Sequence, residues 1–377
     1  MPVSKAGYFP ILDLLRLIAS LCVVLAHSTV FFRCAAGTIE ISPFVLRAGY
    51  YGVIFFYTLS GFLITYLLLK EKKAIGTIAP GAFYKRRALR IWPLYYLIVL
   101  LSFFVFPYLL PMPDAGPMDR WKSALLLYLL FLPNVAAFRI YLPTCFHTYT
   151  IGYEEQFYLV WPFLLRRVGK RLMVLLGVLF FLPPVLEAAH LLILSHGLPF
   201  PAKVTGGIRA VLTFINYSNV PAFIAGAVGA VLYIERKKML ISVMGNRWLT
   251  GLLLVGILYL MYAGRPGSWG YVNLLSIVYA LLILNLIGWD PALSRAGKVM
   301  VAGGRISYGI YIYHPAVLIF VSFLMARAPA MPAAVAYLLY LFLSLVMIFL
   351  VSAISYYYFE RFFLRKKERF RPVMSRE

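Results

Sequence analysis

Charged residues are scarce in this chain, and acidic residues are the scarcest of them. Only 13% of the 377 residues are charged, with 13 Asp or Glu against 36 Lys or Arg. Soluble domains usually carry about 25% charged residues, so the composition excludes an ordinary soluble domain. The three cysteines, Cys22, Cys34 and Cys145, have no metal-ligand spacing. The sequence also lacks a Walker loop, a dinucleotide-binding fingerprint and a G-x-S-x-G nucleophile elbow.

Apolar residues fill the sequence instead. They make up 63% of the chain, and the mean hydropathy is +0.85. Because a membrane span needs about 20 apolar residues, the sequence predicts an all-α, polytopic membrane helix bundle in one domain, 1–377, without an appended soluble domain. The N-terminal apolar stretch does not read as a signal peptide, because it is long and lacks an obvious small-residue cleavage site. The ten expected transmembrane helices are residues 8–32, 48–69, 91–110, 147–165, 171–194, 209–234, 247–263, 271–288, 302–325 and 331–359.

An eleventh apolar stretch, residues 121–138, decides the topology. If it does not cross the membrane, 26 of the 36 basic residues fall on one side and nine on the other. If it crosses once, the asymmetry largely disappears. Lys and Arg concentrate in cytoplasmic loops, so we expect a re-entrant or interfacial segment here and two cytoplasmic termini. Non-helical backbone at membrane depth needs protein or a water-filled cavity beside it. We therefore expect this segment to lie against the rest of the protein or to line such a cavity.

The net charge of +23 follows the same pattern, because the basic residues flank apolar spans. It therefore points to the lipid bilayer and not to nucleic acid as the partner. Cys34 and Cys145 fall on the same expected outer side, which leaves a disulfide between them open. The oligomeric state, a homo-oligomer included, is open as well.

The first helix carries ionisable side chains within an apolar run. Arg16 and His27 are eleven residues apart, which is close to three helical turns, so both lie on one face, about 16 Å apart along the axis. Asp13 precedes Arg16 by three residues and can pair with it. One reading is a buried Asp13–Arg16 pair with an interfacial histidine. The other is a functional face, because intramembrane ionisable residues often mark functional sites.

Two adjacent carboxylates, Glu154 and Glu155, interrupt the fourth expected helix. Adjacent helical residues differ by about 100° in direction, so only one of them can face a given cavity. Glu154 shares its face with Tyr158 and Trp161. We expect Glu154 to orient or charge His27, as carboxylates do in general-base catalysis, and Glu155 to be interfacial.

The cytoplasmic end of the third helix is strongly basic. Arg87 and Arg90 are three residues apart and lie on one side of the helix, next to Lys85 and Arg86. Such a cluster either anchors a helix end in anionic headgroups or holds phosphates by forked hydrogen bonds. In the second helix, Ser60 and Gly61 are small residues that favour close helix packing, with a nucleophilic Ser60 as the minor alternative.

His314 lies near the middle of the ninth expected helix and is followed by Pro315, which frees a backbone carbonyl. A packed, hydrogen-bonded histidine and a functional one fit this position equally well. Tyr308 and Tyr311 are on the same helix.

Six stretches of the sequence together resemble the integral-membrane acyltransferase-3 family of bacterial O-acyltransferases. They occur in order from residue 8 to residue 365 and are "YFPILDLLRLIASLCVVLAHS", "GVIFFYTLSGFL", "FYKRRALRIWPLYY", "TIGYEEQFYLVWP", "GRISYGIYIYHP" and "YYYFERFFLR". The chain departs from the family at Tyr149, Thr150 and Ile151, where Trp-Ser-Leu is usual. The acidic position itself is intact, but the shape of the site beside it differs.

The resemblance implies transfer of an acyl group, commonly acetyl, from cytoplasmic acyl-CoA (acetyl-CoA) to a hydroxyl of a sugar or glycan-type acceptor. The expected location is the bacterial inner (cytoplasmic) membrane, and no metal is expected. The expected catalytic residues are His27 as general base, Glu154 and Arg16. We expect Arg87, Arg90 and Arg86 to bind acyl-CoA. Weaker candidates for substrate contact are His314, Tyr308, Tyr158 and Ser60.

Other functions remain open at this point. His27 could carry the acyl group covalently instead of acting as a base, although direct transfer needs only one hydrogen bond to the hydroxyl. A transporter or flippase of a lipid-linked sugar would also place ionisable residues inside the membrane, but it predicts internal symmetry that the sequence lacks. A structural partner of a glycan-assembly complex would not need Arg16 and His27 on one face.

Overall fold

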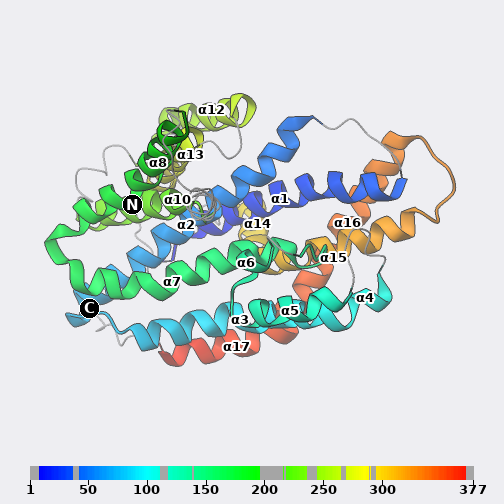
Figure 1. Cartoon of the computed structure of the whole chain (residues 1–377), viewed down its shortest axis with the longest axis horizontal. Helices are drawn as coiled ribbons and strands as arrows, with labels where there is room; N and C mark the ends of the chain where they lie inside the picture. Colours follow the sequence, from blue (N-terminus) through cyan, green and yellow to red (C-terminus); the bar gives the residue numbers. More distant parts are fainter. Residues whose placement is uncertain are drawn as a thin grey trace.

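A computed structural model of the chain describes residues 8–36, 42–110, 118–137, 140–195, 215, 218–235, 244–264, 269–287, 289 and 294–370. All the regular elements of these residues are helices, which confirms the all-α class (Figure 1). The longer helices are α1 (Pro10–Ala36), α2 (Pro43–Ile75), α3 (Pro80–Phe104), α5 (Met118–Leu129), α7 (Tyr149–Val168), α8 (Leu172–Ser195), α10 (Val220–Glu235), α12 (Arg247–Ala263), α13 (Trp269–Leu286), α14 (Arg295–Arg305), α15 (Ser307–Met325) and α16 (Ala333–Ser355).

Short elements link these helices. They are α4 (Phe106–Leu109), α6 (Pro133–Ala136), η1 (Phe146–Thr148), η2 (Gly169–Arg171), the π-helical turn η4 (Tyr356–Glu360), α17 (Arg361–Lys367) and η5 (Glu368–Phe370).

The bundle is built around α2, which packs against α1 on one side and α10 on another. Small residues allow the second of these contacts. A Cβ atom on Gly61 would lie 1.9 Å from the Phe223 carbonyl oxygen, and one on Gly226 would lie 1.9 Å from the Thr58 carbonyl oxygen. The expectation of close packing is thus confirmed for Gly61. The side chain of Ser60, one position earlier, points toward α7, where its hydroxyl donates to Glu154.

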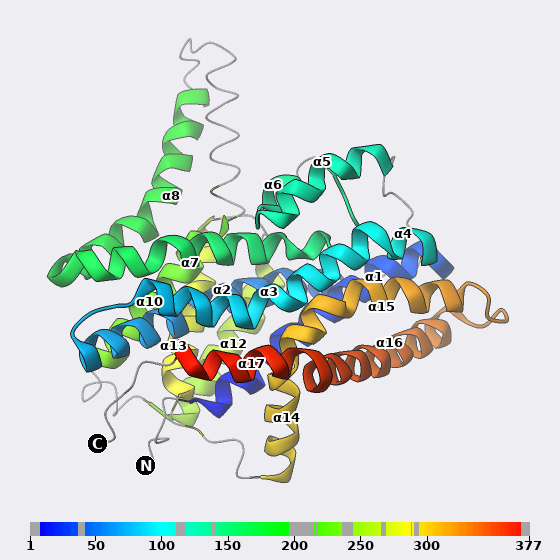
Figure 2. The same ribbon diagram turned by 90° about the horizontal axis from the view of Figure 1, so that it is seen from below.

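Helices α3, α7 and α15 enclose the other face of α1 and α2. Figure 2 shows α3, α7 and α15 running along the same direction as α1, with α14 crossing that direction. Because α14 ends at Arg305 and α15 begins at Ser307, the single helix expected over 302–325 is two helices that meet at an angle. The helix expected over 91–110 instead begins at Pro80 and ends at Phe104.

Among the residues that the structure describes, five helices are long and apolar enough to cross a membrane: Pro10–Phe32, Pro43–Ile75, Pro80–Phe104, Ser307–Met325 and Ala333–Lys367. Shorter apolar helices cover Leu172–Leu186, Val220–Glu235, Arg247–Ala263 and Gly270–Leu286. The chain is therefore a multi-pass membrane protein, while ten transmembrane helices are not confirmed. Part of the stretch expected as the sixth span, 209–214, lies outside the described residues.

Within the stretch 121–138, the described residues 121–137 contain two short helices, α5 and α6, separated by a turn at residues 130–131 (Figure 2). At 12 residues, α5 is shorter than the roughly 20 residues that a span requires. Tyrosines of α3 cap its end, since the Tyr95 and Tyr96 hydroxyls donate to the carbonyl oxygens of Tyr128 and Leu129 at 2.7 and 3.0 Å. A turn thus interrupts this apolar stretch between α5 and α6. Whether the segment is re-entrant stays a prediction.

Candidate active site

Five helices, α1, α2, α3, α7 and α15, leave a cavity of about 110 Å³ between them. This volume holds several water molecules but is below the range of pockets that enclose drug-sized ligands. Polar residues from all five helices line it: Arg16, Tyr57, Ser60, Arg87, Arg90, Thr150, Glu154, Tyr158, Ser307, Tyr308 and Tyr311.

Arg87 and Arg90 give this cavity an excess of positive charge. They are one turn apart on α3, and no carboxylate in the described parts of the chain forms an ion pair with either. The Arg87 guanidinium lies over the rings of Phe83 and Tyr158, 5.7 and 5.9 Å from their centroids, and its Nε atom is buried without a hydrogen-bond partner. Such guanidinium groups fit an anionic ligand with paired oxygens.

The third arginine of the cavity, Arg16, is held in place. Its Nη1 atom donates to Asp13 Oδ1 at 2.6 Å, and the Tyr8 hydroxyl donates to Asp13 Oδ2 at 2.6 Å. The spacing of three residues predicted this ion pair, and the structure confirms it. The pair fixes the Arg16 guanidinium at the cavity wall.

The Glu154 carboxylate also belongs to the cavity. Its Oε1 atom accepts a hydrogen bond from the Ser60 hydroxyl at 2.8 Å, and its Oε2 atom accepts one from the Tyr158 hydroxyl at 3.2 Å. Arg16, Arg87 and Arg90 line the same cavity as this acid. Glu155 points away, and its Oε2 atom accepts from the exposed Trp92 indole at 3.1 Å.

His27 has a different partner. Its Nδ1 atom lies 2.7 Å from Nε2 of the fully buried His314, whose Nδ1 atom lies 2.7 Å from the Tyr311 carbonyl oxygen. The structure therefore does not bring Glu154 to His27 as the sequence suggested. Tyr311 connects the two sets of residues, because its side chain lines the cavity and its carbonyl group contacts His314.

A third histidine, His147, packs against this pair and has no counterpart in the sequence-based predictions. Its ring meets the His314 ring edge-on with centroids 5.0 Å apart, and it is 1% exposed. Its carbonyl oxygen accepts from the Tyr311 and Thr150 hydroxyls, each at 3.1 Å. His147 lies in the 3-10 turn η1, at the first residue of the helix expected over 147–165. Because the α-helix α7 begins only at Tyr149, helical periodicity did not predict which way this side chain points.

Seven of the ten predicted site residues line the cavity: Arg16, Ser60, Arg87, Arg90, Glu154, Tyr158 and Tyr308. His27 and His314 pair beside it. The described part of 121–138 contributes no lining residue. Sequence reasoning missed Tyr57, whose hydroxyl is buried without a hydrogen-bond partner on the cavity wall. Tyr57 is three residues before Ser60 and therefore lies on the same face of the helix, which could have identified it from the sequence.

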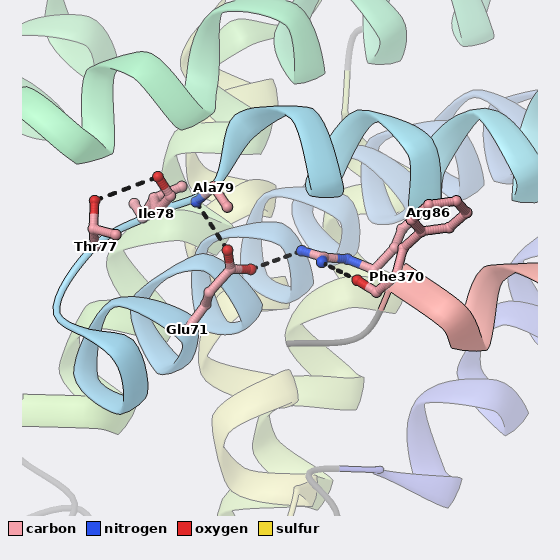
Figure 3. Close-up of polar contacts among 6 residues, drawn as sticks. All are labelled: Glu71, Thr77, Ile78, Ala79, Arg86 and Phe370. Carbon is pink, nitrogen blue, oxygen red and sulfur yellow. Dashed lines mark hydrogen bonds and ion pairs between the residues drawn. The ribbon is translucent and has the colours of Figure 1, made fainter. Parts of the chain in front are cut away.

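Arg86 lies away from the cavity. Its Nη2 atom donates to Glu71 Oε2 at 2.7 Å and its Nη1 atom donates to the Phe370 carbonyl oxygen at 2.8 Å (Figure 3). The other oxygen of Glu71 accepts from the Ala79 backbone N–H at 2.9 Å. Arg86 thus joins the end of α2, the start of α3 and the end of the described chain. The Glu71 carboxylate balances its positive charge, so the position of Arg86 is explained without an acyl-CoA phosphate.

Cys145 is a buried, free cysteine, so the disulfide with Cys34 that the sequence left open is not formed in this structure. Among the residues that the structure describes, His, Cys, Asp and Glu side chains form no group of three or more that could hold a metal ion.

Comparison with known proteins assigns the chain to a family. A family model described as "Acyltransferase domain" (Acyl_transf_3) matches residues 9–357. The chain is 26% identical over 345 residues to the Staphylococcus aureus (strain COL) protein named "Putative O-acetyltransferase SACOL0978", covering 84% of this chain and 52% of that protein. It is 25% identical over 333 residues to "O-acetyltransferase OatA" of Staphylococcus aureus (strain NCTC 8325), covering 84% and 51%.

The chain therefore spans about half the length of the curated relatives it matches. No solved structure matches it. The family match covers most of the chain and includes every residue of the cavity and of the histidine pair. This protein belongs to the acyltransferase-3 family of membrane acyltransferases.

Proposed function

We propose that this protein is an O-acyltransferase that moves an acyl group, acetyl being the expected one, from acyl-CoA to a hydroxyl of a sugar or glycan-type acceptor. The observation that carries the proposal is a cavity lined by Arg87 and Arg90, which form no ion pair within the described residues, with a histidine pair beside its Tyr311 wall. The matched relatives carry names that contain "O-acetyltransferase", and these names support the same reaction.

In this proposal, Arg87 and Arg90 bind the phosphates of acyl-CoA by forked, charge-assisted hydrogen bonds. The cavity is far too small for a whole coenzyme A molecule, so the nucleotide stays at its mouth and only the thioester end goes in. Arg87 and Arg90 are on the side of the membrane that the distribution of basic residues predicts to be cytoplasmic. The expected location is the bacterial inner membrane, with both termini in the cytoplasm.

His27 acts as the general base. The acceptor hydroxyl loses its proton to the free ring nitrogen of His27 as its oxygen bonds to the thioester carbon. The carbon–sulfur bond then breaks, and the proton passes to the thiolate to give free coenzyme A. General-base catalysis of this kind contributes about 10²–10⁴-fold in rate. Glu154 balances the arginines and holds Ser60 and Tyr158 in the cavity wall.

Phosphate recognition by the two arginines is tested with a matched pair of donors. Purified protein and the variants Arg87→Gln and Arg90→Gln are compared with acetyl-CoA and with S-acetylpantetheine, which lacks the phosphates. We expect the KM for acetyl-CoA to rise about tenfold or more in each variant, since a charge-assisted hydrogen bond contributes about 1.5–3 kcal/mol, while S-acetylpantetheine is used as poorly as by the wild type. Equal losses for both donors would contradict phosphate binding at these residues.

A further inference from the structure

A hydrogen-bonded chain of three groups connects α15 to α1. It runs from the Tyr311 carbonyl oxygen to His314 Nδ1, and from His314 Nε2 to His27 Nδ1, with 2.7 Å at each step. The two rings are nearly parallel, at 6°, with centroids 5.0 Å apart. Because 2.7 Å is shorter than the spacing of stacked rings, the two nitrogens meet edge to edge, as hydrogen bonding requires.

Pro315 explains why the Tyr311 carbonyl is free for this contact. In an α-helix, the carbonyl of residue 311 accepts from the backbone N–H of residue 315. Residue 315 is proline and has no N–H. The helix therefore leaves a carbonyl oxygen without its backbone donor in the middle of α15, and His314 Nδ1 is the group that satisfies it.

The carbonyl determines which ring nitrogens carry protons. A carbonyl oxygen only accepts hydrogen bonds, so His314 Nδ1 must carry a proton. In a neutral imidazole, Nε2 is then an acceptor, and the proton between the two rings must belong to His27 Nδ1. His27 Nε2 is left unprotonated, as a general base requires.

The surroundings keep His314 neutral. Its side chain is fully buried, and no carboxylate in the described residues lies within ion-pair distance of it. The buried His147 ring covers it edge-on. A buried charge without a partner is strongly unfavourable, so a protonated His314, which would reverse the tautomer of His27, is disfavoured here.

We propose that His314, held by the Tyr311 carbonyl that Pro315 leaves free, is the positioning residue that fixes His27 in its Nδ1-protonated tautomer. The backbone carbonyl and a neutral histidine thus take the part that a carboxylate plays in a Ser-His-Asp triad. The inference deepens the proposed function, since the tautomer matters for catalysis only if His27 is the base, but the tautomer itself is measurable without activity.

The test is a ¹⁵N NMR spectrum of the full-length protein labelled with [¹⁵N]histidine, in which imidazole shifts report the protonation of each ring nitrogen. The chain has five histidines, and a His27→Gln variant identifies the resonances of His27. We expect a protonated Nδ1 and an unprotonated Nε2 on His27. A protonated Nε2, or a doubly protonated ring, overturns the inference whatever the activity of the variants.

Two substitutions of His314 separate positioning from packing. His314→Gln places an amide oxygen where Nε2 was, and we expect it to keep the His27 tautomer and to lower kcat by less than about threefold. His314→Phe keeps a ring of similar bulk without an acceptor. We expect a mixed tautomer and a kcat lower by about 10–100-fold, the range seen when an orienting partner of a histidine is removed at metal sites, with the KM for acetyl-CoA unchanged.

Equal losses of kcat in the Gln and Phe variants, with the His27 tautomer unchanged in both, would overturn the positioning role. A third variant, Pro315→Ala, restores a backbone donor for Tyr311, and we expect a mixed His27 tautomer there too. Failure of the proposed function can be told apart from failure of this inference. Full transfer activity in His27→Gln would show that His27 is not the base. If the wild-type spectrum still showed the expected tautomer, the inference about His314 would stand.

Discussion

Glu154 and Ser60 are 94 residues apart in the sequence and share a 2.8 Å hydrogen bond at the wall of the arginine-lined cavity. This contact assigns Glu154 to the cavity and leaves the orientation of His27 to another residue. It also places a negative charge among Arg16, Arg87 and Arg90.

Replacing the acid by its amide tests that assignment. Glu154→Gln removes the charge and keeps the size, so the arginines lose their balancing carboxylate and the Ser60 hydroxyl loses a charged acceptor. We expect kcat to fall about tenfold or more, because hydrogen bonds to charged groups contribute about 1.5–3 kcal/mol. Glu155→Gln, whose carboxylate faces Trp92 outside the cavity, is the matched control and should change kcat by less than about threefold. Steady-state kinetics of both variants checks this. Equal losses of kcat in Glu154→Gln and Glu155→Gln would contradict the assignment.

Tyr57 lines the cavity and carries a buried hydroxyl that has no hydrogen-bond partner among the described residues. We expect Tyr57→Phe to leave the melting temperature of the ligand-free protein unchanged or higher, because an unsatisfied buried hydroxyl costs about 1–3 kcal/mol. Its kcat/KM should fall about tenfold if the hydroxyl binds substrate. The hydroxyl of Tyr51 is also unpartnered but does not line the cavity, so Tyr51→Phe should leave kcat/KM unchanged. Parallel losses of kcat/KM in the two variants would argue against a substrate contact.

Arg86 and Glu71 are expected to stabilise the fold and not to bind acyl-CoA. Their side chains are 14% and 3% exposed, and removing one partner of a buried ion pair costs about 3–5 kcal/mol. Glu71→Gln and Arg86→Gln should each lower the melting temperature clearly and leave the KM of the folded protein for acetyl-CoA unchanged. Lys85→Gln, at an exposed neighbouring position, is the control for loss of a positive charge. A raised KM in Arg86→Gln alone would show that Arg86 does bind the donor.

The crossing of α2 and α10 depends on two glycines. Gly61→Ala or Gly226→Ala would place a Cβ atom 1.9 Å from a backbone carbonyl oxygen, and overpacking of this kind costs about 1–3 kcal/mol or more. Gly251 and Gly256 in α12 have nothing within 4 Å of an added Cβ, so their alanine variants should be neutral or stabilising by up to about 1 kcal/mol. Thermal unfolding of the four variants checks this, and equal destabilisation by all four would be inconsistent with the crossing described.

The sequence predicted contacts within one helix much better than contacts between helices. The Asp13–Arg16 pair follows from a spacing of three residues, and the Tyr158–Glu154 hydrogen bond from a spacing of four. Both are properties of a single helix. The shared direction of Arg87 and Arg90 was predictable for the same reason, and both line the cavity.

The partner of His27 could not be obtained in this way. His314 is 287 residues away, and helical periodicity gives the face of each helix but not how far one helix slides along another. The sequence suggested Glu154 as the partner of His27 and did not suggest His314 for that role. The packing of α1 against α15, and the short turn that brings His147 to the pair, decide between them.

The central claim, that His27 is the base for acyl transfer from acyl-CoA, is tested most directly by following radiolabel from [¹⁴C]acetyl-CoA into hydroxyl-bearing material of membrane vesicles that contain the full chain or its His27→Gln variant. We expect label transfer by the wild type, transfer at least about 100-fold slower by the variant, and the same thermal stabilisation of both purified proteins by acetyl-CoA. Transfer at equal rates by the two proteins would contradict the account.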